Sequence, residues 1–162
     1  MLSKGEFKQL FDRYFDAIRS FIFYRCGNID LASDMAQDTF MKIWEKREQL
    51  NSVNLKSLLY KIANGLVISN YRKTVIHSEF EQSMSIQNDV SLSPEEELAF
   101  EELFFSYAKA LEKMPETQRV VFLMSRNDEL KYSEIAACLD IGVKAVEKRM
   151  SAALQFLRTE LL

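Results

Sequence analysis

The sequence has few of the residues that interrupt helices. Its 162 residues include only four glycines and two prolines, and no stretch shows sustained Val/Ile/Thr alternation with a period of two. Apolar residues recur instead at the three- and four-residue spacing of amphipathic helices. Hydrophobic residues make up 48% of the chain, with twelve phenylalanines and six tyrosines among them, which is enough apolar side chain for compact cores. We therefore predict an all-α protein.

Groups that carry catalysis or bind metal are scarce. The chain has one histidine, His77, and two cysteines, Cys26 and Cys138, which lie far apart and lack the spacing of metal ligands. There is no serine–histidine–aspartate or cysteine–histidine set, no pair of carboxylates placed for catalysis and no glycine-rich phosphate loop. The sequence thus predicts a protein that is not an enzyme and that uses no metal or cofactor. Both cysteines are expected to be reduced thiols.

Long hydrophobic runs are also missing. No window reaches about 18 uncharged apolar residues, the minimum for a transmembrane helix. At the N-terminus, Lys4, Glu6, Lys8 and Asp12 leave no room for the apolar centre of a signal peptide. We predict a cytoplasmic protein without membrane insertion.

The net charge of −3 is unevenly distributed along the chain. Residues 1–74 hold twelve basic and eight acidic side chains, a net charge of +4. Residues 75–108 hold eight acidic side chains and no basic one, whereas residues 109–162 have a net charge of +1. The acidity is therefore concentrated in one segment between two mildly basic blocks, which leaves nucleic-acid binding open to both blocks.

Periodicity divides the chain into two small helical domains. In residues 1–74 we expect three or four helices, one with its apolar stripe over residues 7–22, one that begins near an Asp30 N-cap and fades near Leu50, and one over residues 55–73. Residues 95–162 form the second domain, with helices at 95–113, 116–124, 132–139 and 143–161. Between them, residues 75–94 lose the apolar period and are rich in Ser, Gln, Glu and Asn. We interpret them as a flexible acidic linker.

Residues 132–149 have the pattern of a helix-turn-helix. Ala136 is small where two helices must approach closely, and a shared apolar seam is expected from Ile135, Leu139, Ile141, Val143, Val146 and Met150. The second helix of such a motif lies in the major groove of DNA. Asp140 stands in the turn, where a left-handed conformation is needed, and Gly142 stands at the N-cap. The alternative is a plain helical hairpin with a solvated basic face.

Three motifs in the same order resemble the sigma-70 family, specifically its small extracytoplasmic-function (ECF) class. Residues 30–44 are similar to region 2, and the match continues at residues 58–64 and 71–73. Residues 114–122, which precede the helix-turn-helix, resemble the start of region 4. The resemblance implies an ECF sigma factor that binds core RNA polymerase and directs promoter-specific initiation. It assigns region 2 to residues 1–74, the linker to 75–94 and region 4 to 95–162.

One face of the second helix carries a polar, acidic stripe. Its members recur at helical spacing, and the opposite face is apolar; the stripe consists of Asp34, Gln37, Asp38, Met41 and Glu45. Such a stripe suits docking on a basic helical surface better than binding DNA. The family docks this helix on the clamp helices of the largest polymerase subunit, and the resemblance implies that role here. A merely solvated helix face is the other interpretation.

The resemblance also implies two DNA-binding elements. At the minus-ten element, amide donors, hydroxyls and cations are expected from Asn51, Ser52, Asn54, Lys56, Lys61, Arg72 and Lys73. Tyr60 and Tyr71 either stack on bases or pack in the core. The basic face is thinner than in the family, because Asn64-Gly65 stands where Arg-Asn is common and Ser69 where Asp is common. At the minus-thirty-five element, one outward side of the recognition helix offers Lys144, Ala145, Lys148, Arg149 and Ser151.

The partners implied are the clamp helices and flap of core polymerase, promoter DNA and an anti-sigma factor that covers the same surfaces. Two other classes fit a helix-turn-helix behind a helical domain. One is a stand-alone transcriptional regulator with a sensing or dimerising N-terminal domain. The other is an adaptor that binds only protein.

Overall fold

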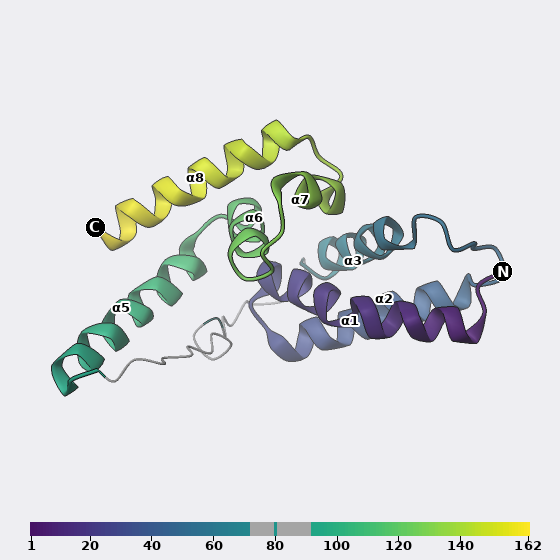
Figure 1. Ribbon diagram of the computed structural model, residues 1–162, viewed down its shortest axis with the longest axis horizontal. Helices are drawn as coiled ribbons and strands as arrows, with labels where there is room; N and C mark the ends of the chain where they lie inside the picture. The colour runs from purple at the N-terminus through teal and green to yellow at the C-terminus, as the bar shows by residue number, and fades with distance from the viewer. Residues whose placement is uncertain (72–79, 81–91) are drawn as a thin grey trace.

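The computed structural model describes residues 1–71, residue 80 and residues 92–162. Every regular element within these residues is an α-helix (Figure 1). The helices are α1 (Lys4–Cys26), α2 (Ile29–Glu45), α3 (Leu55–Tyr71), α5 (Pro94–Lys113), α6 (Glu116–Arg126), α7 (Tyr132–Leu139) and α8 (Val143–Leu161). The prediction of an all-α fold is confirmed.

Local side-chain chemistry sets the ends of the helices. Ser3 and Ser93 cap the N-termini of α1 and α5, and Glu6 and Glu96 complete reciprocal capping boxes. Gly27 ends α1 with a φ of 68°. Glycine adopts this left-handed conformation without the steric cost of a Cβ atom.

The start and end of α2 differ from the prediction. Asn28, and not Asp30, is the N-cap, because its side-chain oxygen accepts a hydrogen bond from the Leu31 amide at 2.9 Å. Asp30 lies in the first turn, where a negative charge interacts favourably with the helix dipole. The helix ends at Glu45, so the residues up to Leu50 form a turn instead of fading helix.

The N-terminal domain is built around the aromatic residues of α1 and α2. The Phe40 ring is 2% exposed and lies edge-on to Phe11, with 5.0 Å between ring centroids. Phe7 contacts Trp44 at 5.0 Å, so the half-buried Trp44 packs against the core from the side. α3 completes the bundle through buried residues such as Leu59 and contacts both other helices.

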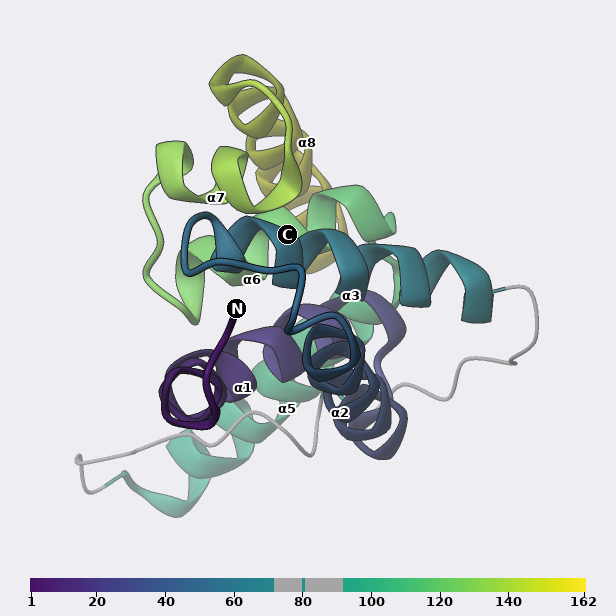
Figure 2. The same ribbon diagram turned by 90° about the vertical axis from the view of Figure 1, so that its right-hand side faces the viewer.

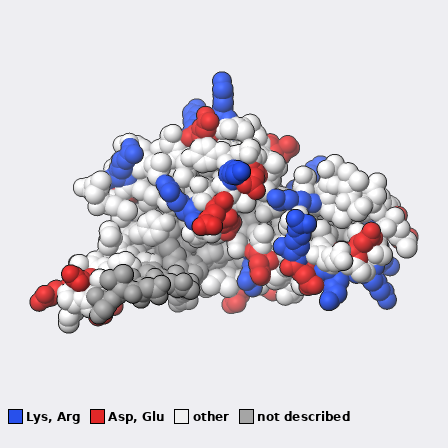
Figure 3. Space-filling model, viewed as in Figure 1, with Lys and Arg blue, Asp and Glu red and all other residues white. Residues whose placement is uncertain are grey.

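The C-terminal domain packs α8 across α5, α6 and α7. Its core combines the fully buried Leu123 and Met124 of α6 with Ile135 of α7 and Val146 of α8. α5 contacts mainly α8, and its N-terminal half projects from the body of the molecule (Figure 1). Acidic side chains gather at this projecting end (Figure 3), where Glu95, Glu96 and Glu97 form the first turn.

The two domains lie against each other. α1 contacts α6, and α3 lies between α1 and the α7–α8 pair (Figure 2). The sequence predicted two domains on a tether but gave no sign of this contact. Most of the predicted linker, including His77, lies outside the described residues, and the domain boundaries at 74 and 95 stay predictions. Phe80 is described, and it is buried at 2% exposure.

One contact between the domains depends on protonation. The Tyr24 hydroxyl donates a hydrogen bond of 2.7 Å to the Asp128 carboxylate. Burial raises the pKa of Asp128, and the Tyr24 hydrogen bond lowers it by less. Because the pKa is raised in the folded state, the stability linked to this carboxyl is fully present below its unfolded pKa and is lost as the pH rises through its folded pKa.

We therefore expect Asp128→Asn to raise the melting temperature at neutral pH. The amide oxygen can still accept the Tyr24 hydrogen bond, and no charge is buried. The gain should shrink as the pH is lowered through the acidic range, where Asp128 itself becomes protonated. Thermal melts of both proteins as a function of pH measure this. A gain of the same size at every pH would contradict the explanation.

Candidate functional surfaces

The polar stripe of α2 is exposed along its whole length. All five of its predicted members face solvent, and Met41 is 59% exposed. The opposite face, with Ala32, Ala36, Phe40 and Ile43, is buried against α1 and α3. The side chains of Asp34, Gln37, Asp38, Met41 and Glu45 are thus not part of the core, and their role in binding a partner stays a prediction.

An apolar groove runs beside this stripe, which the sequence did not reveal. It has a volume of about 500 Å³ and lies between α1 and α2. Gln37 and Met41 belong to both the stripe and the groove; the other lining residues are Lys4, Phe7, Phe11, Phe40 and Trp44. The surface therefore joins an acidic edge to an apolar hollow. This combination fits a basic, amphipathic protein element.

The loop between α2 and α3 presents the predicted amide and hydroxyl groups. Asn51, Ser52 and Asn54 are all exposed. Asn54 has a φ of 61°, and its carbonyl accepts a hydrogen bond from the Leu58 amide at 3.2 Å. Val53, which the prediction missed, is 66% exposed in the middle of this loop. The loop thus exposes one apolar side chain among its amide and hydroxyl groups.

The predicted minus-ten cations divide into two groups. Lys56 and Lys61 are exposed on α3. Arg72 and Lys73 lie outside the described residues, as does the side chain of Tyr71. The loop of residues 51–54 and the two lysines thus lie in the loop before α3 and in the N-terminal half of this helix.

Tyr60 belongs to the core. It is 3% exposed, and its ring lies edge-on to Phe21 with centroids 5.2 Å apart. Burial is the main reason that the pKa of its phenol is raised. The ring has no free face for a base, so the packing interpretation holds for this tyrosine.

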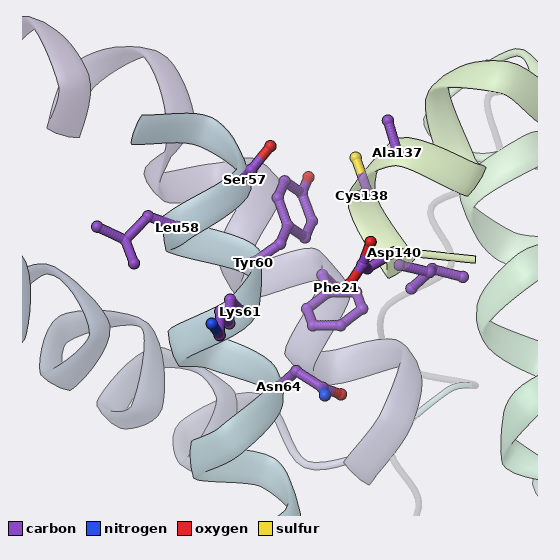
Figure 4. Close-up of a pocket in the computed structure, with 10 residues that line it drawn as sticks. Phe21, Ser57, Leu58, Tyr60, Lys61, Asn64, Ala137, Cys138 and Asp140 are labelled. Atoms are coloured by element: carbon purple, nitrogen blue, oxygen red, sulfur yellow. The ribbon is translucent and has the colours of Figure 1, made fainter. Parts of the chain in front are cut away.

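A cavity of about 560 Å³ separates α3 from α7. Ser57, Lys61 and Asn64 line it from α3, and Cys138 and Asp140 line it from the end of α7 (Figure 4). The Tyr60 hydroxyl and the Cys138 thiol face one another across the gap.

Cys26 and Cys138 are both free and buried, and burial raises the pKa of each thiol. Neither is therefore an activated nucleophile.

The helix-turn-helix forms at the predicted residues. α7 and α8 have the predicted bounds, and Asp140 adopts the left-handed conformation with a φ of 55°. The Ile141 amide closes the turn on the Ala136 carbonyl at 3.0 Å. The prediction for Val143 was wrong, because it is 42% exposed and not part of the apolar seam. Val143 is the first residue of α8, and the buried residues of this helix begin at Val146.

The turn of the helix-turn-helix contains two residues that are not the best for their positions. Asp140 has a Cβ atom in the left-handed region. Gly142 caps α8 without a side-chain hydrogen bond. A Cβ atom at Gly142 meets nothing within 4 Å. Asp140→Gly with Gly142→Ser should thus raise the free energy of unfolding by about 1 kcal/mol. Urea unfolding measures the change, and a loss of stability would contradict this account of the turn.

The recognition helix presents a basic face at its N-terminal half. Lys144, Lys148 and Ser151 are exposed, and Ala145 and Arg149 are half-buried beside them. Basic side chains project from the molecule over the start of α8 (Figure 3). Glu147 is also exposed in this stretch and reduces its net charge. All five predicted residues thus lie on the free side of the helix or at its edge.

Comparison with known families agrees with this arrangement. The family model for sigma-70 region 2 matches residues 10–75, and the model for sigma-70 region 4 matches residues 104–157. Together they cover both helical domains in the family's order. The chain belongs to the sigma-70 family.

Several curated relatives place it in the ECF class. The chain is 26% identical over 174 aligned residues to the ECF RNA polymerase sigma factor SigW of Bacillus subtilis, covering 99% of this chain and 92% of that protein. It is 24% identical to the RNA polymerase sigma factor YlaC of B. subtilis (94% and 90% covered). It is also 24% identical to the ferric citrate uptake sigma factor FecI of Escherichia coli (92% and 87% covered).

Solved structures share the fold. The sigma factor RpoE of Bartonella quintana, in complex with the anti-sigma factor NepR, superposes with a TM-score of 0.66 at 24% identity, and 96% of each chain is covered. CnrH in complex with the cytosolic domain of CnrY gives a TM-score of 0.65 at 21% identity, with 97% of this chain and 88% of that chain covered.

Sigma factors are non-catalytic, regulatory subunits of RNA polymerase. Within the described residues, no group of three or more His, Cys, Asp or Glu side chains is arranged to hold a metal ion. No helix of the described part is long and apolar enough to span a membrane.

Proposed function

We propose that this sigma-70 chain binds core RNA polymerase through α2 and directs it to promoters that it reads at two elements. The observation that carries the proposal is the presence of two separate functional surfaces on one short chain. One is the exposed acidic stripe beside an apolar groove, which suits protein docking. The other is a helix-turn-helix with a free basic face, which suits DNA. A promoter-specificity subunit needs both surfaces, and it acts with the polymerase in the cytoplasm.

The α2 stripe is the proposed site for the polymerase clamp helices. Asp34 and Asp38 are one helical turn apart and both exposed, so they can pair with basic side chains on a facing helix. Met41 and the groove behind it add apolar contact at the centre of the surface. Apolar centres with charged rims are typical of specific interfaces. Asp34, Gln37, Asp38, Met41 and Glu45 are the residues to which we assign this role.

The loop before α3 and the exposed side of α3 are the proposed minus-ten site. Amide groups of Asn51 and Asn54 can pair with the edges of flipped bases, and Lys56 and Lys61 can contact phosphates. Ser52 and Val53 lie between the two asparagines in the same exposed loop. Arg72 and Lys73 are assigned to this site by sequence alone.

Region 4 is proposed to read the minus-thirty-five element and to bind the polymerase flap. Lys144, Lys148 and Arg149 are placed to reach guanine edges or phosphates, while Ala145 leaves room for a thymine methyl group. Ser151 continues the same face one turn later. In the same domain, α5 exposes Leu98, Leu103 and Phe105 at 47–58%, which supports an apolar protein contact.

An anti-sigma factor is a further proposed partner. The two solved structures with the same fold contain sigma factors bound to NepR and to CnrY. In this chain, a protein that covers the α2 stripe and the α3 face would block polymerase and DNA together.

A DNA-binding experiment separates this proposal from a stand-alone regulator. Promoters are first mapped from the transcripts that appear when the chain is overexpressed, and labelled fragments are then tested in gel shifts. We expect tight, sequence-specific binding only when core polymerase is present. Equally tight and specific binding by the chain alone would favour the regulator and contradict the proposal. No specific binding in either case would favour an adaptor that binds only protein.

A further inference from the structure

Two adjoining cavities lie between α3 and α7. The larger has a volume of about 560 Å³ and the smaller a volume of about 250 Å³. Ser57, Tyr60, Ala137 and Cys138 line both cavities. Pockets that hold small molecules measure roughly 300–1,000 Å³ and occur preferentially where domains meet. The space between α3 and α7 therefore has the size and the position of a small-molecule site.

Opposite charges line the two sides of each cavity. Lys61 of α3 and Asp140 at the end of α7 line the larger cavity, and Lys56 of α3 and Glu134 of α7 line the smaller one. The Asp140 carboxylate points from α7 toward α3 (Figure 4). Among the described residues, no ion pair joins either lysine to either of these carboxylates. Each cavity thus has a positive wall and a negative wall that are too far apart to pair directly.

Neutral groups lie between the charged walls. The hydroxyls of Ser57 and Tyr60 and the thiol of Cys138 point into the gap (Figure 4). Phe21 and Leu139 add apolar surface to the larger cavity. An inorganic ion of either sign would be repelled by one of the two walls. Opposite charges with hydrogen-bonding and apolar groups between them fit a dipolar organic molecule.

We propose that the space between α3 and α7 is a binding site for a small zwitterion, an α-amino acid or a dipeptide with an apolar side chain. Its carboxylate pairs with Lys61 or Lys56 of α3, and its ammonium group pairs with Asp140 or Glu134 of α7. Such a molecule bridges charges that do not reach each other, through charge-assisted hydrogen bonds. Because both lysines are exposed, binding should weaken as the salt concentration rises.

Calorimetric titration of the full-length chain with L-leucine and with L-leucylglycine is the first test. We expect saturable binding of at least one probe. The N-acetylated and the C-amidated forms of that probe each lack one charge and should bind at least about fivefold more weakly. No binding at about 10 mM probe, or equal binding of the blocked forms, would overturn the proposal.

Filling the space is the second test. Ala137 is exposed on α7 and lines both cavities, so Ala137→Leu places a larger side chain in them. Leucine is a good helix former, so α7 should still fold, which circular dichroism checks. We expect a loss of at least about tenfold in affinity for the probe. Unchanged affinity in the folded variant would place the binding elsewhere and overturn the proposal.

Isosteric changes on α7 test the ammonium contact. Glu134→Gln with Asp140→Asn removes both negative charges of this wall. Asparagine tolerates the left-handed conformation of residue 140, and glutamine can still accept the hydrogen bond from the Lys131 amide. We expect about fivefold weaker binding of the zwitterionic probe and unchanged binding of its N-acetylated form, which has no ammonium group. An equal loss for both forms would contradict the ammonium contact.

A matched variant controls for the lost charge. Glu129→Gln with Glu147→Gln removes two exposed carboxylates of the same domain, and neither residue lines the cavities. This control should bind the zwitterionic probe as the wild type does. If it loses as much affinity as Glu134→Gln with Asp140→Asn, net charge and not the α7 wall governs binding, and the proposal fails.

A bound zwitterion has a consequence for transcription that rests on the proposed function. Lys56 and Lys61 are the proposed minus-ten cations, so the carboxylate of the zwitterion competes with DNA phosphates for them. We expect a saturating probe to lower promoter-specific transcription by the wild type and not by Ala137→Leu. Unchanged transcription at saturation would contradict this competition. Calorimetry needs neither polymerase nor DNA, whereas a failed function shows as no promoter-specific transcription even without the probe.

Discussion

Replacing Asp34 and Asp38 together by arginine is expected to weaken binding to core polymerase at least about a hundredfold. Both side chains are exposed on the α2 stripe, one turn apart, and the proposed partner surface is basic. Juxtaposed like charges at an interface cost several kcal/mol, and each 1.4 kcal/mol is tenfold in affinity. Fluorescence titration of labelled chain with core polymerase measures the change.

A matched variant controls for the altered charge. Asp12→Arg with Asp16→Arg changes two exposed carboxylates of α1 at the same spacing and by the same charge. Their ion pairs with Lys8 and Arg19 are exposed, and such pairs contribute little to stability. This control should bind core polymerase nearly as the wild type does. Equal losses in both variants would show that total charge, and not the stripe, governs binding.

Replacing Lys148 and Arg149 together by glutamate is expected to lower transcription from a target promoter at least about tenfold. Both residues lie on the free side or edge of the recognition helix, and the change removes contacts to bases or phosphates and adds repulsion. Binding to core polymerase should be unchanged. The slope of log affinity for the promoter against log salt concentration should fall by roughly 2, because two phosphate-directed charges are lost.

The control for this variant lies in the same domain. Lys109→Glu with Lys113→Glu reverses two exposed charges of α5, which pair with Glu112 and with Glu160 at the C-terminal end of α8. Transcription from the target promoter should stay near the wild-type level. If Lys148→Glu with Arg149→Glu has no effect on any promoter, the helix-turn-helix is only a structural hairpin and the chain is better explained as a protein-binding adaptor.

The local parts of the fold could be predicted because each has a local physical cause. Ser93-Pro94 begins α5 since serine caps and proline favours the first helical position. Asp140 takes the left-handed turn of the helix-turn-helix as expected. The N-cap of α2 could not be predicted in this way, because Asp30 and Asn28 are both good N-cap residues. Only the backbone geometry after Gly27 decides between them.

The parts that could not be predicted depend on contacts between distant segments. The groove beside the α2 stripe exists because Phe7 and Phe11 of α1 lie against Phe40 and Trp44 of α2. Periodicity assigns each of these residues to a core face but does not show where the core is left open. Likewise, periodicity does not predict the burial of Arg119 on α6. Its guanidinium donates hydrogen bonds both to the Tyr24 carbonyl of α1 and to the Leu111 and Met114 carbonyls of its own domain.

Run-off transcription with purified core polymerase tests the central claim most directly. The template carries a promoter mapped after overexpression of the chain, and core polymerase is assayed with and without the purified protein. We predict transcripts from a single start site only when the chain is present, and their loss when Asp34 and Asp38 are both replaced by arginine. Failure of the chain to produce such transcripts, together with sequence-specific binding to the same DNA without polymerase, would contradict its assignment as a promoter-specificity subunit.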